Sequence, residues 1–538
     1  MKLTFFKEKA KSSRFFAAAL IFILAFTLRV VGANWGMPHS NLHPDEGLVY
    51  AEAFNCVLNR SFETRIYYRP NHVSIKLNAI LYLGIQEAYF FPRGLNDFNA
   101  NFNEHFALFM TASRILSALM GACAVVFAYL IACFFDEKKA RYAALLFALF
   151  ASFIEHSHYL TPDMPLLLFL MGALWASLSY YRKPTVSMLF WMSFFTALAT
   201  CEKYPGLYGC VLIAVTVIVT HYKKPLMVVR DGLLAIFFLV LGIAIISPVL
   251  IIDIREVLHT MEGQNKTSHI GADGLNFIET VIYYSKNTAV GLGLILTVCS
   301  IYGIVKSFIK NTKPAIIIFS LLIYIIPISS LRVHWERYTL PIYAAMLLFA
   351  AFGAFYLYDD LSVLLKESKR AKALLCIVLF VLPILSQFTS GVASCARFLA
   401  PDSRIELQPV LADLGVTEAN SVHDCNTPLD PGGFYGAFGN FEAGDPRKGK
   451  YDLHPEYVVT SSAQRDLFLA ADPEKYGGVA RFYELLDEEH ELVKVYPVEV
   501  PSPHFFEIQN IWCSLRSIIR YINGAMTGYE IRVYRLTN

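Results

Sequence analysis

The most constraining feature of this sequence is a series of long segments that contain almost no charged residues. Each run is about 20 residues long, the length that a helix needs to cross roughly 30 Å of hydrocarbon. Of the 538 residues, 55% are hydrophobic and only 17% are charged. A transmembrane β-barrel would instead show segments of about 10 residues with alternating polarity. The pattern therefore predicts a polytopic α-helical membrane protein.

The apolar runs predict about 11 transmembrane helices. Their expected ranges are 15–34, 106–135, 140–157, 163–181, 185–201, 205–221, 231–252, 288–309, 314–331, 339–358 and 373–391. No small-residue cleavage site follows the first run, so we interpret it as an uncleaved anchor.

Basic residues alternate between the loops that join these runs. They are dense before the first run and after the second, fourth, sixth, eighth and tenth, whereas "EHSHYLTPD" between the third and fourth contains none. Because Lys and Arg concentrate in cytoplasmic loops, the N-terminus is expected in the cytoplasm. An odd number of spans then puts the C-terminal region outside.

Two of the expected outer segments are too long to be connectors. The first, 35–105, should contain helices that lie in the membrane interface, within a transmembrane domain spanning 1–394. The second, 395–538, is richer in charge, Gly and Pro, and its alternating stretches "YVVTS", "ELVKVYPVEV" and "YEIRVYRL" predict a small α/β domain. A third outer loop, 253–287, is short and could act as a lid. The sequence shows no Walker-type loop and no nucleic-acid-binding patch.

Cysteine positions give little further guidance. The 10 cysteines show no metal-ligand spacing. Cys395, Cys425 and Cys513 fall on the expected outer side, where a disulfide is feasible, but the sequence does not determine a pairing.

An acidic pair, Asp45 and Glu46, follows the first span in "NLHPDEGLVY". One interpretation is structural, because acids after Pro44 would stabilise the start of the next helix through its dipole. The other is functional, because charged groups beside a membrane are costly unless water or a partner meets them.

A second polar cluster occupies the short outer turn "EHSHYLTPDMP". It contains Glu155, His156, His158 and Asp163. Thr161-Pro162-Asp163 resembles a helix start, with Pro at an early position. Helix capping does not explain the two histidines and the glutamate beside it.

Two further outer turns supply cations. "CEKYPG" contains Glu202 and Lys203. Lys203 departs from the positive-inside pattern, which suggests that it binds an anionic partner. The simpler explanation is that its side chain snorkels to the lipid headgroups. "LRVHWERYTLP" brings Arg332, His334, Glu336, Arg337 and Tyr338 to the outer end of the tenth span. Arg29, near the outer end of the first span, could join them or snorkel. A carboxylate that removes a proton from a hydroxyl, beside cations that stabilise a departing phosphate, would fit this set of groups.

With these motifs in order, the chain resembles the GT-C class of integral membrane glycosyltransferases. Within that class it is similar to the family of dolichyl-phosphate-mannose–protein mannosyltransferases and bacterial aminoarabinose transferases. The resemblance rests on segments that recur in order along nearly the whole chain: "HPDEGLVY", "SRILSALMGACAVVFAYLIACFF", "HSHYLTPDMPLLLF", "ATCEKYPGLYG", "HWERYTLPIYA", "DSRIELQPVL" and "GYEIRVYRL".

The resemblance implies transfer of a sugar from a polyprenyl-phosphate carrier to an acceptor hydroxyl at the outer face, with inversion. It implies that Asp45 is the general base with Glu46 beside it, and that Lys203, Arg337 and Tyr338 lie near the carrier phosphate. His158, His156 and Asp163 would orient donor or acceptor. Some relatives use a divalent cation such as Mg or Mn, which Asp45, Glu46, His158 and Asp163 could bind, although no ligand spacing requires it.

The 253–287 loop is too short to hold the large lumenal insertion of eukaryotic mannosyltransferases, so the resemblance favours a prokaryotic-type enzyme. The acceptor, whether protein, lipid or glycan, stays open. A different class, a transporter, flippase or assembly subunit for lipid-linked sugars, is the alternative. Transporters place polar groups at mid-membrane in broken helices, whereas here the polar residues gather at one end of the spans.

Overall fold

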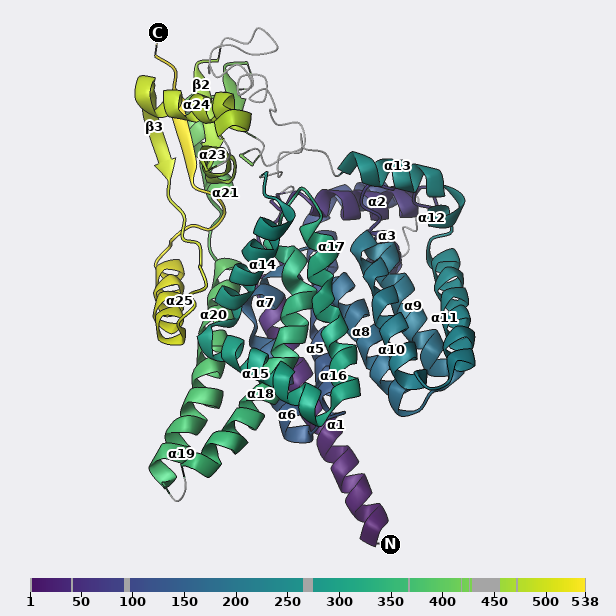
Figure 1. The fold of residues 1–538 in the computed structure, drawn as a ribbon. Coiled ribbons are helices and arrows are strands. Elements are labelled where there is room, and N and C mark those ends of the chain that lie inside the picture. Colours follow the sequence, from purple (N-terminus) through teal and green to yellow (C-terminus); the bar gives the residue numbers. More distant parts are fainter. Residues whose placement is uncertain are drawn as a thin grey trace. The chain divides into compact units, whose positions relative to one another are not determined.

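The computed structural model describes residues 2–39, 42–90, 97–264, 274–365, 368–417, 419–424, 426–427, 455–470 and 473–537. The protein is mostly helical, with a small sheet in the C-terminal region (Figure 1). It divides into two compact units. We call Met1–Ala33, Leu48–Cys395 and Ser502–Leu515 the membrane unit, and Asn34–Gly47, Ala396–Pro501 and Arg516–Asn538 the tail unit.

The first half of the chain contains α1 (Lys2–Val30), α2 (Glu46–Leu58), α3 (His72–Tyr89), α4 (Phe98–Glu104), α5 (Phe106–Ala132), α6 (Glu137–Leu149), α7 (Ala151–Ser157), α8 (Asp163–Arg182), α9 (Val186–Glu202), the 3₁₀ helix η2 (Tyr204–Tyr208), α10 (Gly209–His221), α11 (Pro225–Ile246), α12 (Val249–Ile252) and α13 (Ile254–Gln264). The second half contains α14 (Phe277–Leu292), α15 (Leu294–Lys310), α16 (Thr312–Phe319), η3 (Ser320–Tyr324), α17 (Ile325–Ser329), η4 (Glu336–Thr339), α18 (Leu340–Leu364), α19 (Lys369–Cys376), the π-helical turn η5 (Ile377–Val381), α20 (Leu382–Arg397), α21 (Ser403–Asp413), α23 (Ser462–Leu469), α24 (Pro473–Glu489) and α25 (Glu507–Ile522).

Within the described residues, seven helices are long and apolar enough to cross a membrane, or eight if the bent pair α14 and α15 forms one span. The apolar part of α1, Phe16–Val30, and helix α9 are shorter. The polytopic helical class is therefore confirmed, whereas the expected count of about 11 is not.

The span expected at 288–309 is not a straight helix. The chain bends by 112° between α14 and α15. Gly293 lies at the bend with φ +84°, a conformation that glycine adopts without a steric penalty. An apolar run in a sequence indicates that a segment is buried and how long it is, but it does not indicate where the helix breaks.

The span expected at 140–157 is also interrupted. Helix α6 ends at Leu149, Phe150 has an extended backbone with ψ 117°, and α7 begins at Ala151. The buried guanidinium of Arg29 donates hydrogen bonds to the Ala148 carbonyl at 3.1 Å and the Phe147 carbonyl at 3.1 Å. These carbonyls belong to the last turn of α6, where the helix leaves them without partners of its own.

The 253–287 loop is largely helical where the structure describes it. Helices α12 and α13 and the first part of α14 occupy it, and 265–273 lie outside the described residues. Asn276 and Glu279 form a capping box at the start of α14, which fixes the point where the chain becomes helical again. That this loop acts as a lid stays a prediction.

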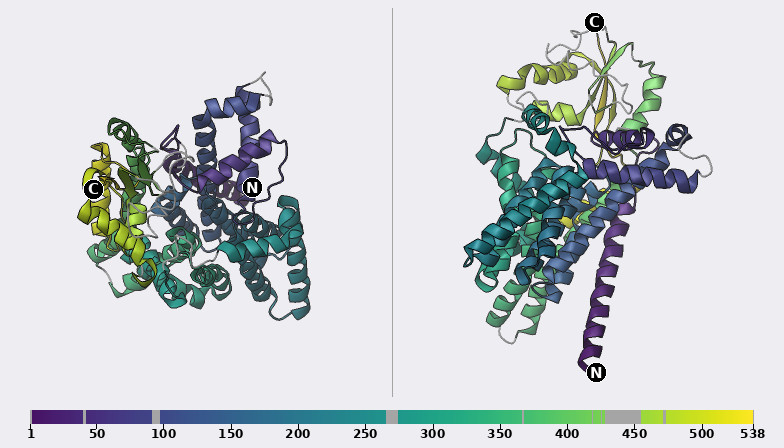
Figure 2. Two further views of the ribbon diagram at one scale, coloured as in Figure 1. Left: turned by 90° about the horizontal axis from the view of Figure 1, so that it is seen from above. Right: turned by 90° about the vertical axis from the view of Figure 1, so that its right-hand side faces the viewer.

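The first outer segment, where one or two interfacial helices are expected, contains three helices among its described residues, α2, α3 and α4. In Figure 1, α2 and α13 run across the ends of the upright helices α8 to α11 of the membrane unit. Figure 2 shows α1 running alongside the other long helices.

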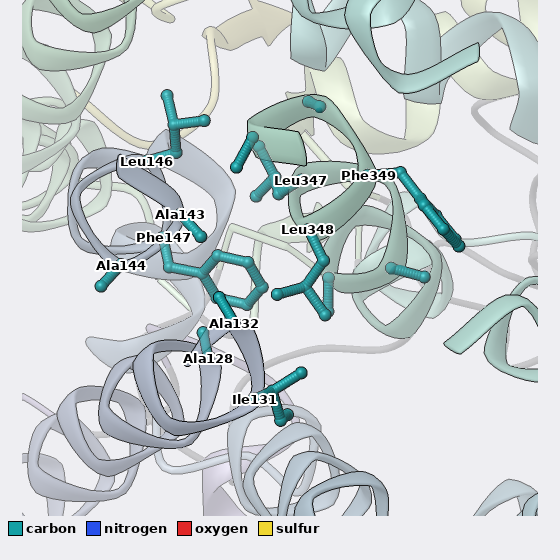
Figure 3. Close-up of a cluster of buried hydrophobic side chains, with 14 of the residues drawn as sticks. Ala128, Ile131, Ala132, Ala143, Ala144, Leu146, Phe147, Leu347, Leu348 and Phe349 are labelled. Atoms are coloured by element: carbon teal, nitrogen blue, oxygen red, sulfur yellow. The ribbon is translucent and has the colours of Figure 1, made fainter. Parts of the chain in front are cut away.

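The core of the membrane unit forms where α5, α6 and α18 meet. Ala128, Ala132, Ala143, Phe147 and Leu348 interdigitate there (Figure 3). Beside this core, α15 crosses α18 at glycine positions. A Cβ atom added to Gly303 would lie 2.0 Å from the Phe349 carbonyl oxygen, and one added to Gly353 would lie 1.8 Å from the Cys299 carbonyl oxygen. Small residues thus let the two backbones touch, as is common where helices pack within membranes.

The tail unit holds a four-stranded sheet of β1 (Ser421–His423), β2 (Tyr457–Ser461), β3 (Glu491–Tyr496) and β4 (Ile531–Arg535), in the order β1-β2-β4-β3. Strand β1 is parallel to β2, and the other neighbours are antiparallel. Helix α21 packs on one face through Leu407 and Leu411, and α24 lies on the other, where Asp487 accepts a hydrogen bond from Tyr534 at 2.7 Å (Figure 2). The predicted small α/β region is confirmed.

The cysteines considered for a disulfide are not bonded where the structure describes them. Cys395 and Cys513 are free thiols, and the Cys395 thiol donates to the Leu28 carbonyl at 2.9 Å. Cys425 lies outside the described residues.

Candidate active site

The main polar cluster of the membrane unit centres on Asp163, the first residue of α8. Its carboxylate is 3% exposed. Lys203, which follows the last residue of α9, places Nζ 2.6 Å from Asp163 Oδ1. Arg337, in η4 before α18, places Nε 3.8 Å from Asp163 Oδ2. The structure therefore brings together three residues that the sequence had put in three separate turns.

Each of the three side chains is positioned by the end of a transmembrane helix. The main chain at Lys203 leaves the helical conformation with φ −154°, and Pro205 then starts the 3₁₀ turn η2. Arg337 precedes Pro341 in the first turn of α18, a position where proline is favoured because no backbone donor is lost. The breaks between the helices thus create the turns that carry the cluster.

The cluster brings two cations to one carboxylate. Lys203 and Arg337 both approach Asp163, and Asp163 Oδ2 accepts no hydrogen bond from the described residues. Aromatic rings lie under both cations: Lys203 Nζ is 4.5 Å from the Tyr338 ring centre, and the Arg337 guanidinium is 5.4 Å from that of Trp335. These faces stabilise the cations without neutralising them.

His156 lies close enough to this cluster to sense its charges. Burial lowers the pKa of His156, while the nearby carboxylates of Glu155 and Asp163 raise it. Because burial is the larger effect, the imidazole is neutral at pH 7 and adds no further positive charge.

His158 faces the main chain instead of the cluster. Its Nδ1 lies 2.8 Å from the Ile154 carbonyl oxygen and its Nε2 lies 2.7 Å from that of Val31. Burial lowers its pKa to about 4. Each ring nitrogen faces a main-chain carbonyl oxygen, and the neutral ring donates its one N–H to one of them, so neither nitrogen points toward a substrate or a metal.

Arg29 is likewise not part of the cluster, because its guanidinium is fully buried against the end of α6 as described above. Glu202, next to Lys203, stabilises the start of α3. It accepts hydrogen bonds from the Ser74 amide at 2.9 Å and the Ser74 hydroxyl at 2.5 Å. His334 is similarly engaged, with Nε2 2.8 Å from the Leu331 carbonyl oxygen.

The acid pair Asp45 and Glu46 lies where the tail unit's Asn34–Gly47 segment enters α2. Asp45 is half-buried and Glu46 is 2% exposed. The amide of Asp45 donates to His43 Nδ1 at 3.2 Å, and the amide of Glu46 donates to the His43 carbonyl at 3.1 Å. Both acids stand at the N-terminal end of α2, where a helix dipole favours the ionised form.

The four residues considered for a metal ion do not form a ligand set. Both nitrogens of His158 face main-chain carbonyl oxygens, and Asp163 is paired with two cations. Among the residues that the structure describes, no group of three or more His, Cys, Asp or Glu side chains is arranged to hold a metal. We therefore derive no step through a metal ion.

A cavity of about 390 Å³ lies elsewhere in the membrane unit, between the end of α11 and the chain that precedes α3. Its charged residues are already engaged. Arg65 pairs with Glu63 at 2.7 Å, Lys76 Nζ donates to the Ile246 carbonyl, and Tyr67 donates to Asp253. This cavity is therefore electrically balanced.

Comparisons with known proteins concern the family and the fold of the chain. Residues 105–252 match the family model of dolichyl-phosphate-mannose-protein mannosyltransferase, a stretch that includes Asp163 and Lys203 but neither Asp45 nor Arg337. No curated protein matches the sequence. The apo oligosaccharyltransferase of Archaeoglobus fulgidus matches the structure with a TM-score of 0.53 and 13% identity, over 97% of this chain and 88% of that one. The chain has a GT-C fold.

Two further solved structures are similar. The oligosaccharyltransferase AglB of Archaeoglobus fulgidus, in complex with an inhibitory peptide and a dolichol-phosphate, has a TM-score of 0.50 and 13% identity, covering 91% of this chain and 73% of that one. ArnT of Cupriavidus metallidurans bound to undecaprenyl phosphate has a TM-score of 0.46 and 16% identity, covering 76% and 73%. The family-model match over 105–252 supports glycosyltransferase activity in a multi-pass membrane protein, and the solved structures show the fold.

The structural roles of Glu202 and His158 were not expected from the sequence. Their partners, Ser74 and Val31, are 128 and 127 residues away. A serine in the first turn of α3 is a cue for capping, but it does not identify the acceptor.

Proposed function

We propose that this chain transfers a sugar from a polyprenyl-phosphate carrier to an acceptor hydroxyl. The observation that carries the proposal is the pairing of Lys203 and Arg337 with one carboxylate in a buried cluster at the ends of three transmembrane helices. A phosphate is an anion that the Lys203 ammonium and the Arg337 guanidinium can bind by charge-assisted hydrogen bonds. The AglB structure, which holds a dolichol-phosphate, is consistent with such a ligand.

Lys203 and Arg337 would act on the phosphate in two stages. In the ground state they hold the carrier phosphate by charge-assisted hydrogen bonds. As the bond between the anomeric carbon and the phosphate oxygen breaks, the electron pair moves to that oxygen, and the same cations stabilise the added charge. Asp163 keeps the two cations together before the carrier arrives, and the face of the Tyr338 ring stabilises the Lys203 ammonium.

Asp45 is proposed as the general base. Its carboxylate takes the proton of the acceptor hydroxyl while the hydroxyl oxygen attacks the anomeric carbon from the side opposite the phosphate. One bond forms and one breaks, so the products are the glycosylated acceptor with inverted configuration and free polyprenyl phosphate. Glu46, buried beside Asp45, would keep the ionised carboxylate oriented toward the acceptor.

The direction of the reaction across the membrane follows from the charge pattern of the loops. We propose a cytoplasmic N-terminus, an extracytoplasmic tail and transfer at the outer face of a bacterial inner or plasma membrane. The acceptor is a protein, lipid or glycan that presents a hydroxyl there.

The test uses purified protein in liposomes with undecaprenyl-phosphate-linked hexoses and pentoses and a crude envelope acceptor mixture. Wild type should release free undecaprenyl phosphate. Asp45→Asn should lower the rate by about 10²–10⁴-fold, the usual contribution of a general base, with little change in carrier binding. Lys203→Met should weaken binding of undecaprenyl phosphate by about 10–100-fold, the value of one charge-assisted hydrogen bond.

Lys306→Met is the matched control, because Lys306 pairs with Asp360 at 2.5 Å elsewhere in the membrane unit. It should leave carrier binding and sugar release unchanged. If wild type consumes no donor, or if Asp45→Asn is as active as wild type, the enzymatic proposal fails. Movement of the intact lipid-linked sugar between leaflets would then indicate a flippase.

A further inference from the structure

The segment that carries the acid pair is held by the tail unit. We call residues Asn34–Gly47 the acid segment. It belongs to the tail unit although most of that unit lies far along the chain: Leu42 contacts Arg404, 362 positions away. Trp35 packs edge-on against Phe398 with ring centres 5.6 Å apart. The acid segment thus contacts the tail at its beginning and again near the acids.

Arg404, in the first turn of α21, makes the second contact. Its side chain is 4% exposed, and its Nη1 donates to the Leu42 carbonyl at 2.6 Å. Its Nε and Nη2 donate to the two carboxylate oxygens of Asp402 at 2.9 and 2.8 Å. This two-point pairing fixes the plane of the guanidinium. The third nitrogen, Nη1, is therefore held in the direction of the Leu42 carbonyl.

The Asp402–Arg404 pair is itself tied to the sheet. The Ser403 amide donates to the Thr527 carbonyl at 2.9 Å, in the chain that leads into β4. A Cβ atom on Gly528 would lie 3.0 Å from Asp402 Oδ1, so a glycine keeps that approach open. Arg404 is therefore oriented by the framework of the tail unit.

The chain between Leu42 and the acids is short and folded on itself. Leu42 is 3% exposed, and a Cβ atom on Gly36, which has φ +69°, would lie 1.7 Å from Leu42 Cδ1. Two hydrogen bonds to His43, from the amides of Asp45 and Glu46, close the turn that follows. Fixing the Leu42 carbonyl therefore restricts the backbone of Asp45.

From this geometry we infer that Arg404 is a positioning residue for Asp45, and that the tail unit acts in catalysis by holding the acid segment in its reactive conformation. This inference rests on the proposed function, because it takes Asp45 as the base. A displacement of about 1 Å at a reacting group can lower a rate by about 100-fold, so the loss of this contact should reduce turnover more than binding.

The test compares Arg404→Lys and Arg404→Gln with Arg465→Gln in the full-length protein. A lysine keeps the charge but lacks the planar fork that contacts Asp402 and Leu42 together. Arg465 is the matched control: its side chain is 9% exposed and pairs with Glu530 at 3.0 Å in the same unit, and the contacts described for it do not include the acid segment. Hydrogen exchange, sugar release from undecaprenyl-phosphate-linked sugars and binding of undecaprenyl phosphate alone are measured for each variant.

Both Arg404 variants should increase amide exchange at Asp45 and Glu46 by 10-fold or more and lower kcat by about 10–100-fold, with the KM for donor and the affinity for undecaprenyl phosphate within about twofold of wild type. Arg465→Gln should change neither exchange at the acids nor kcat. Exchange in β2 reports whether the tail stays folded. If Arg404→Gln unfolds the tail, Arg404→Lys decides the result.

Unchanged exchange at Asp45 and Glu46 in a folded Arg404 variant would overturn the inference, as would unchanged kcat beside an active wild type. The two proposals fail in different ways. If Asp45→Asn keeps full activity, the base assignment is wrong, whereas the exchange measurement still reports whether Arg404 orders the acid segment.

Discussion

Glu507 Oε1, on the first residue of α25, accepts a hydrogen bond from the Ile295 amide at 2.6 Å. The adjacent Leu294 amide donates to the Phe505 carbonyl at 2.7 Å. These amides belong to the first turn of α15 and have no partner within their own helix. A segment more than 200 residues away thus satisfies the helix end that the bend at Gly293 creates.

Replacing Glu507 with valine should destabilise the membrane unit by about 1–3 kcal/mol, because a buried amide would lose its acceptor. Glu507→Gln keeps an oxygen at the same place and should cost less. Thermal unfolding in detergent measures the difference, and hydrogen exchange at Ile295 localises it. Equal effects of the two substitutions would show that the carboxylate oxygen does not cap α15.

The contact between α15 and α18 predicts opposite outcomes for two glycine substitutions. Gly303→Ala should lower the thermal unfolding temperature, because the new methyl group would meet the Phe349 carbonyl oxygen and force the helices apart. Gly84→Ala is the control. An added Cβ there meets no atom within 4 Å, so helix propensity should stabilise α3 by about 0.5–1 kcal/mol. A neutral Gly303→Ala would contradict the close approach.

Removing the carboxylate of the cluster should be more harmful than removing a cation. Asp163→Asn removes the carboxylate that pairs with both Lys203 and Arg337, and breaking a buried ion pair in this way costs about 3–5 kcal/mol. The double variant Asp163→Asn/Lys203→Met should lose less stability than the sum of the two single variants. Additive losses in this double-mutant cycle would show that the residues do not interact.

Two neighbouring residues of the tail unit should give opposite pH dependences. Burial raises the pKa of Asp424 to about 7, whereas the pKa of an Asp in an unfolded chain is about 3.9. The folded state therefore binds the proton more tightly, and this contribution to stability is lost as the pH rises from about 4 to about 7. Burial lowers the pKa of His423 to about 4, against about 6.5 when unfolded, so its contribution is lost as the pH falls through the same range.

In the wild type the two effects offset each other, because folding in effect moves a proton from His423 to Asp424. Asp424→Asn should leave a tail whose stability rises between pH 4 and 6.5, and His423→Gln one whose stability falls between pH 4 and 7. Hydrogen exchange of the β2 amides, corrected for the intrinsic effect of pH on exchange, measures the stability of the tail in both variants. Identical pH profiles for the two variants would contradict the assignment.

Much of the fold could be predicted from the sequence because it depends on local patterns. Apolar runs identified the helical membrane class, and alternation in "YVVTS" and "YEIRVYRL" identified β2 and β4. The breaks at Phe150 and Gly293 could not be predicted, since both lie inside continuous apolar runs. Their stability comes from Arg29 and Glu507, which are distant in sequence.

The candidate site could be predicted in part for the same reason. Asp163, Lys203 and Arg337 were expected at one level because topology orders the ends of helices, and they meet. His158 and Glu202 carried the same sequence signal, yet they bind main-chain and hydroxyl groups of other elements. Which polar residues face a ligand and which satisfy the backbone depends on three-dimensional contacts that one sequence does not reveal.

The strand order of the tail sheet also has a consequence for biosynthesis. Strand β4 lies between β2 and β3, so neither the sheet nor the site where Arg404 is held can form before residues 531–535 have been made. The acids at 45 and 46 are synthesised almost 500 residues earlier. We therefore expect a chain stopped at residue 530 to leave 34–47 open to protease, whereas the full chain protects it. During synthesis, Asp45, the proposed base, would therefore stay inactive until translation of the tail is complete.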